Sequence, residues 1–147
     1  MKNIYTIGEE GDRLIGKKIS GISGPNNEEV CMLLFTEPWM AAQYLRYDLK
    51  NNTAGVYEIN SSESWEYYKD LMIDIFNTRN ALIDPCSSTC PQPFGYQFLL
   101  LESANDFFKV SDAIRKDLPC INCYRKDQFL EKNGPLEKIK IFSLKFN

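Results

Sequence analysis

The stretch "VCMLLFTEPWMAAQYL", residues 30–45, passes from a strand to a helix within a few positions. Its first six residues, 30–35, form a continuous apolar run of strand length, which predicts a central strand covered on both faces. Thr36 is the expected N-cap of the following helix, while Glu37 favours the positive end of the helix dipole and Pro38 fits the first turn. The predicted buried stripe of this helix consists of Trp39, Ala42, Leu45 and Leu49.

Strands and a second helix flank this stretch. Short strands punctuated by glycines are predicted in residues 3–8 and 13–22, and a further strand at 54–59. A helix capped by Ser61 or Ser62 follows, with acidic residues near its start. The face that this helix buries is predicted to contain Trp65, Tyr68, Met72, Ile75 and Phe76.

The second half of the chain continues the alternation. A short strand is predicted at 81–84 and another at 95–102. Ser103 is the expected cap of a third helix over 104–118, and residues 138–146 alternate as an edge strand protected by lysines. The inner side of the third helix is predicted to carry Phe107, Ser111, Ile114 and Leu118.

Length and composition indicate a single α+β domain over residues 1–147, with a mixed β-sheet and about three α-helices packed on it. Hydrophobic residues make up 44% of the chain and charged residues 25%, as in ordinary globular proteins. The net charge of −3 disfavours a nucleic-acid-binding protein, which needs a basic face. The chain has no histidine, so Ser-His and Cys-His nucleophile pairs and imidazole metal ligands are excluded.

The sequence predicts a cytoplasmic protein. Its N-terminus lacks the apolar core of a signal peptide, and no uncharged apolar run reaches the eighteen residues that would suggest a membrane span. Cysteines in such a compartment are reduced by default, and their odd number, five, argues against a secreted disulfide framework.

Four of these cysteines form two close pairs in proline-marked loops. Cys86 and Cys90 lie in "DPCSSTCPQP" (84–93), and Cys120 and Cys123 lie in "LPCINCY" (118–124). Two such pairs are the usual way to supply four thiolates to zinc. Disulfides, or plain loop residues without a ligand, are the alternatives that the spacing leaves open.

Two other readings of the cysteines are less favoured. A thioredoxin-type redox motif needs its thiolate at a helix N-terminus, whereas Cys120 follows the end of a predicted helix. Cys31 lies within the predicted central strand and is expected to be a small buried hydrophobic residue.

Aromatic residues make up 13% of the chain, and several tyrosines fall outside the predicted buried stripes. Exposed tyrosines beside acidic residues are typical of protein-binding surfaces. Scattered surface tyrosines without a partner are the alternative. The tyrosines in question are Tyr44, Tyr47, Tyr57, Tyr67 and Tyr124.

The segment "MLLFTEPWMAAQYL" (32–45), followed by "ALIDPCSS" (81–88), resembles SseB-type domains over residues 30–90. The shared pattern is a hydrophobic strand, then Phe-Thr, an acidic residue and a helix with an aromatic-Leu pair. The resemblance implies a bacterial accessory or interaction protein without a catalytic centre. It also implies structural roles for Phe35 and Thr36, as apolar anchor and helix cap.

The favoured hypothesis is therefore a non-enzymatic, cytoplasmic protein-interaction domain of accessory or toxin-immunity type. Its acidic, tyrosine-bearing surface would bind another protein, such as a basic nuclease toxin, and neither nucleic acid nor a membrane. The alternative is a structural or regulatory zinc-binding domain that uses Cys86, Cys90, Cys120 and Cys123. An enzyme is the third interpretation, and it would have to use carboxylates, lysines, tyrosines or thiolates.

Overall fold

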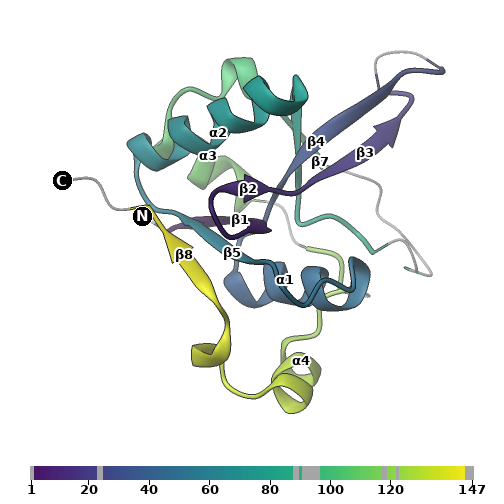
Figure 1. Cartoon of the computed structure of the whole chain (residues 1–147), viewed down its shortest axis with the longest axis vertical. Helices are drawn as coiled ribbons and strands as arrows, with labels where there is room; N and C mark the ends of the chain where they lie inside the picture. Colours follow the sequence, from purple (N-terminus) through teal and green to yellow (C-terminus); the bar gives the residue numbers. More distant parts are fainter. Residues whose placement is uncertain are drawn as a thin grey trace.

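The protein has an α+β architecture in which helices cover both sides of two mixed β-sheets (Figure 1). The sequence predicted one mixed sheet and about three α-helices. The described part of the chain instead contains two four-stranded sheets and four α-helices. The computed structural model describes residues 2–22, 25–87, 90, 97–116, 119–121 and 123–144.

The first sheet has the strand order β2-β1-β5-β8. The strand β1 pairs antiparallel with β2 and β5, while β8 runs parallel to β5 at the edge, as predicted. The predicted strand at 138–146 is shorter than expected, and residues 145–146 lie outside the described residues. The strands are β1 (Ile4–Glu9), β2 (Arg13–Leu14), β5 (Gly55–Ile59) and β8 (Ile141–Ser143).

The second sheet has the order β3-β4-β6-β7. The apolar run predicted as a strand at 30–35 supplies most of β4, which begins two residues earlier, ends at Leu34 and lies inside the sheet between antiparallel β3 and parallel β6. The prediction of a central strand is therefore confirmed. The strands are β3 (Gly16–Ser20), β4 (Glu28–Leu34), β6 (Asn80–Ile83) and β7 (Gln97–Leu100).

The two sheets adjoin at two points. The chain passes from β2 to β3 through Ile15, whose amide donates to the carbonyl of Ile7 at 2.9 Å. Tyr5 of β1 and Phe35, directly after β4, exchange two backbone hydrogen bonds of 2.9 and 2.7 Å. Just after the first of these points, within the second sheet, a Cβ on Gly16 of β3 would lie 2.9 Å from the carbonyl oxygen of Cys31 in β4, which explains the glycine.

Two hydrophobic cores lie on the two faces of β4. Met32 and Leu34 point into the core that includes Trp65 of α2, while Leu33 points into the core that includes Trp39 of α1. The helices α2 and α3 cover the first core, and α1 and α4 contribute to the second (Figure 1). The α-helices are α1 (Pro38–Gln43), α2 (Ser62–Phe76), α3 (Phe107–Ile114) and α4 (Lys126–Asn133).

Helix α2 begins as predicted and ends differently. Ser61 caps it, because the Ser61 hydroxyl accepts from the Ser64 amide at 3.1 Å and the Ser64 hydroxyl accepts from the Ser61 amide at 3.0 Å. Its predicted residues Trp65, Tyr68 and Met72 are buried. Ile75 and Phe76 are 59% and 38% exposed, so that part of the prediction is wrong. They belong to the last turn of the helix, where the buried face ends at Met72.

Two further helix predictions need correction. Asp106, and not Ser103, caps α3, because its carboxylate accepts from the Phe108 and Lys109 amides at 3.0 and 3.3 Å. Leu49 follows a π-helical segment (Tyr44–Asp48) that continues α1, and its side chain is exposed. The described inner residues of α3, namely Phe107, Ser111 and Ile114, are buried as predicted, whereas Leu118 lies outside the described residues.

Candidate metal centre

The loop that carries Cys86 starts from a carboxylate buried between two parallel strands. Asp84 follows β6, and its two carboxylate oxygens accept from the Thr36 amide at 2.9 Å and the Thr36 hydroxyl at 2.8 Å. Thr36 is therefore not the N-cap of α1; Glu37 occupies that position without a side-chain bond. The backbone of Asp84 has a φ of 44°, a left-handed conformation that Asp tolerates better than most residues. These contacts fix the point at which the loop leaves the sheet.

Burial dominates the electrostatics of Asp84. It raises the pKa of the carboxyl from 3.8 to about 6, although the two bonds from Thr36 and the positive charge of Arg115 act in the opposite direction. Arg115 donates to the carbonyls of Thr36, at 3.0 Å, and of Asn3. The three side chains thus tie together the ends of β4 and β6 and the end of α3.

Hydrogen bonds from two side chains attach the connection between α3 and α4 to α1 and to the loop that carries Cys86. The buried Tyr124 donates its hydroxyl to the carbonyl of Pro85 at 2.7 Å and packs edge-on against Trp39. Gln43 of α1 donates to the carbonyl of Cys123. The two cysteine loops, far apart in the sequence, are therefore joined by protein contacts alone.

The four loop cysteines converge at this junction. Their sulfur atoms all lie within 4.8 Å of one another, and those of Cys90 and Cys120 are 3.8 Å apart. The amide of Ser87 donates to the sulfur of Cys123 at 3.4 Å, and the amides of Cys123 and Tyr124 both donate to the carbonyl of Cys120 at 3.1 Å. The convergence that a four-cysteine site requires is therefore present.

The spacing of the sulfur atoms suits a tetrahedral metal ion. A Zn–S bond of about 2.3 Å implies sulfur–sulfur distances of about 3.8 Å in a regular tetrahedron. The separation between Cys90 and Cys120 has this value, and the others need to close by an ångström at most. The cluster of four cysteines could hold a metal ion.

The thiols of this cluster need a cation before they can all ionise. Burial, followed by hydrogen bonds to the thiols of Cys90 and Cys120, raises the pKa of Cys123. Four thiolates this close would repel one another, whereas a divalent cation can replace their protons. Cys86 and Cys120 are buried, while Cys90 and Cys123 are partly exposed.

The other interpretations of the cysteines have less support. All five cysteines lie in the described ranges, and none of them forms a disulfide. Cys120 lies beyond the end of α3 and well before α4 begins at Lys126, so it is not at a helix N-terminus. Cys31 is fully buried, as predicted, and burial raises its pKa to about 11.

The predicted tyrosine surface is largely absent. Tyr44, Tyr57 and Tyr124 are buried, which corrects the prediction that they are surface residues, whereas Tyr47 and Tyr67 are exposed. The buried hydroxyls have internal partners; that of Tyr57 donates to the carbonyl of Glu9 at 2.6 Å, for example. These tyrosines lie in or beside the two cores. Their burial could not be predicted from periodic apolar patterns, because they fall outside the predicted stripes.

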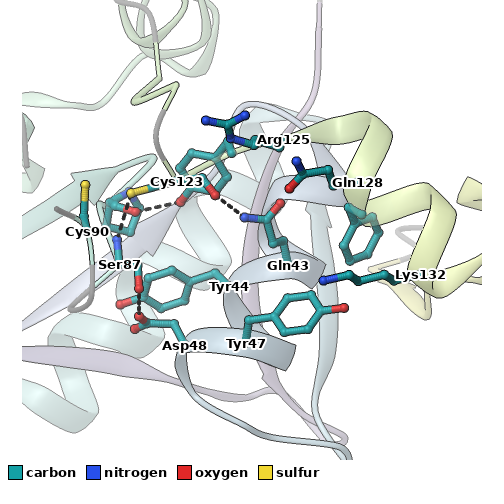
Figure 2. A pocket seen from close by; sticks show the side chains of 13 residues that line it. Gln43, Tyr44, Tyr47, Asp48, Ser87, Cys90, Cys123, Arg125, Gln128 and Lys132 are labelled. Atoms are coloured by element: carbon teal, nitrogen blue, oxygen red, sulfur yellow. Dashed lines mark hydrogen bonds between the residues drawn. The ribbon is translucent and has the colours of Figure 1, made fainter. Parts of the chain in front are cut away.

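A pocket of about 290 Å³ opens beside the cluster, and Cys90 and Cys123 form part of its wall (Figure 2). The π-helical segment Tyr44–Asp48 and one face of α4 form most of the rest, together with neighbouring residues, namely Gln43, Pro85, Ser87, Tyr124 and Arg125. The sequence analysis missed this pocket because it did not predict α4. That helix has only two apolar residues, Phe129 and Leu130, and therefore no buried stripe that periodicity could reveal.

Comparison with known proteins adds no identification. No protein-family model matches this chain, and the search of curated proteins found no match. The resemblance to SseB-type domains therefore stays a prediction. In the described part of the chain, no helix has both the length and the apolar character needed to cross a membrane.

Proposed function

We propose that this protein is a zinc-binding domain in which Cys86, Cys90, Cys120 and Cys123 hold one Zn²⁺ through four thiolates. The observation that carries the proposal is the mutual approach of the four sulfur atoms, all within 4.8 Å. A tetrahedral set of four sulfur ligands takes zinc or iron. Zinc is proposed because two close cysteine pairs in loops are the usual frame of a structural zinc site.

The role of the ion would be structural. Four protein thiolates fill the tetrahedron and leave no position for a water molecule or substrate, which a catalytic zinc site keeps open. The ion would clip the loop after β6 to the connection between α3 and α4. Because those segments are far apart in the chain, the clip removes conformational freedom from the unfolded state and stabilises the fold.

The surroundings suit a thiolate cluster. Zinc with four thiolates carries a net charge of −2, and the Ser87 amide already points at the sulfur of Cys123. The guanidinium of Arg125 lines the same pocket as Cys90 and Cys123 and contributes positive charge nearby (Figure 2). Amide donors and cations of this kind lower the cost of gathering negative charge.

Metal analysis of the native protein tests the proposal. The protein would be purified under reducing conditions without chelator, and its metals would be counted by elemental mass spectrometry. We expect one zinc per chain and four thiols that resist a thiol reagent until a chelator is added. Iron in place of zinc would refute the assignment of the metal, and fast-reacting loop thiols without any metal would refute the site.

Two variants separate loss of the site from loss of the fold. Cys120→Ser removes one ligand and should abolish stoichiometric zinc. Cys31→Ala removes a buried thiol in β4, outside the cluster, and should keep one zinc per chain. A Cys120→Ser protein that stays folded and retains full zinc would contradict the assignment of this ligand.

Protein binding stays a prediction, because no described contact favours a particular partner. Only Tyr47 and Tyr67 remain exposed among the tyrosines on which it rested. Capture experiments with purified protein in its own cell extract would test for a basic partner, as the toxin-immunity hypothesis requires.

A further inference from the structure

The pocket beside the cysteine cluster has the composition of a small-ligand site. Its volume of about 290 Å³ is near the lower end of the range typical of ligand pockets. It lies between the π-helical segment Tyr44–Asp48 and α4, with the cysteine loops at one end (Figure 2). π-Helical segments are rare and occur frequently at functional sites.

Aromatic rings form much of the pocket wall. Tyr44 and Tyr47 come from the π-helical segment, Tyr124 from the connection before α4, and Phe129 from α4 itself. Tyr44, Tyr124 and Phe129 are buried in the second core, so their rings are held in place, whereas Tyr47 is exposed at the opening. Such walls offer flat apolar surface to a planar molecule.

Three polar side chains of α4 and its N-cap residue line the pocket. Arg125, Gln128 and Lys132 follow one another at steps of three and four residues, so they share one face of the helix. All three are exposed, and none forms a side-chain hydrogen bond or ion pair with the described residues. Two positive charges and an amide are therefore available to one ligand.

The opposite side of the pocket carries an acceptor. Asp48, at the end of the π-helical segment, accepts a hydrogen bond of 2.6 Å from the hydroxyl of Ser87. In Figure 2 this pair lies away from Arg125, Gln128 and Lys132, with the tyrosine rings of the wall between them. A ligand with its acidic group toward α4 keeps that group away from Asp48.

We propose that this pocket binds a small planar organic molecule that carries one anionic group, a carboxylate, sulfonate or phosphate. The planar body would pack against Tyr47 and Phe129, and the anionic group would accept hydrogen bonds from Arg125, Lys132 and Gln128. The inference goes beyond metal binding, and it holds whichever metal the cluster binds.

A fluorescent probe of this chemistry provides the test. 1-Anilinonaphthalene-8-sulfonate has a planar naphthalene ring system, an attached anilino ring and one sulfonate, and its emission rises in an apolar site. We expect saturable binding of one molecule per chain by fluorescence, confirmed by calorimetry. Its neutral analogue N-phenyl-1-naphthylamine lacks the sulfonate and should bind at least about tenfold more weakly.

Variants of α4 locate the site. The double variant Arg125→Gln, Lys132→Gln should weaken binding of the sulfonate by about tenfold or more, and should leave the neutral analogue unaffected. Lys126→Gln, on the same helix but outside the pocket, should bind as the wild type does. The metal content of each variant, measured on the same preparation, shows whether the cysteine cluster is intact.

Three results would overturn the proposal. These are absence of sulfonate binding to the folded wild type, equal affinity for the charged and neutral probes, and a double variant that retains wild-type affinity. Zinc in the cluster together with any of these results would leave the proposed function standing. Probe binding to a protein that contains no metal would support the ligand pocket and refute the proposed zinc site.

Discussion

Replacement of Asp84 by asparagine should change how the stability of the protein depends on pH. The carboxyl is only 8% exposed, and burial raises its pKa from 3.8 to about 6 against the opposing effect of Thr36 and Arg115. Between about pH 4 and pH 6 the folded protein therefore binds a proton that the unfolded chain has released. The stability contributed by this group is full below pH 4 and falls as pH rises to 6.

The size of the effect follows from the shift. About two pH units at 1.36 kcal/mol each give about 3 kcal/mol, as an order of magnitude, lost between pH 4 and pH 6. Asparagine cannot ionise, so the variant does not lose this stability as the pH rises. It also suits the left-handed backbone at position 84, and its carbonyl can still accept from the Thr36 amide.

The assay is urea unfolding of wild type and Asp84→Asn at several pH values from 4.5 to 7.5. Relative to wild type, the free energy of unfolding of the variant should rise by about 2 kcal/mol between pH 4.5 and pH 7. Protonation of the metal-binding thiols affects the free energy of unfolding of both proteins equally, so it cancels when the two values are subtracted. The exposed Asp70→Asn serves as a control and should show a constant difference from wild type. If the difference in free energy of unfolding between Asp84→Asn and wild type did not change with pH, the claim that burial outweighs the bonds from Thr36 would be refuted.

Three further predictions concern the site and the sheets. A zinc chelator should lower the melting temperature, and added Zn²⁺ should restore it, as differential scanning fluorimetry would show. Tyr124→Phe leaves the carbonyl of Pro85 without its 2.7 Å donor and should cost about 1–3 kcal/mol in chemical unfolding, whereas Tyr67→Phe, at an exposed bond, should cost less than about 1 kcal/mol. Gly16→Ala brings a methyl group against the backbone of β4 and should destabilise by at least about 1–3 kcal/mol; wild-type stability would contradict the close approach of β3 and β4 at this position.

Elements with a periodic apolar pattern could be predicted from the sequence, and elements stabilised by distant partners could not. The strand β4 and the buried face of α2 follow directly from local patterns. Thr36 was a reasonable helix cap by position, but Asp84, forty-eight residues away, takes its hydrogen bonds. Helix α4 is polar on most of its surface and owes its place to packing of Phe129 against Trp39.

For the candidate site, cysteine spacing identified the four residues but not their distances. Tyr124, whose ring the sequence predicts at the surface, is buried instead, and its hydroxyl joins the connection between α3 and α4 to the loop of Cys86. The pocket depends on the π-helical segment, which has no reliable sequence signal. Local sequence patterns can thus suggest which residues could bind a metal, while the tertiary structure determines whether those residues lie close enough together.

The position of β4 between the two cores bears on how the protein opens. Successive side chains of this strand belong to different cores, and Phe35 at its end is hydrogen-bonded to the other sheet. Neither core can come apart while the other keeps β4 in place. The backbone amides of Cys31 to Leu34 should therefore exchange with solvent deuterium only when the whole molecule unfolds, which makes them the reporters of its global stability.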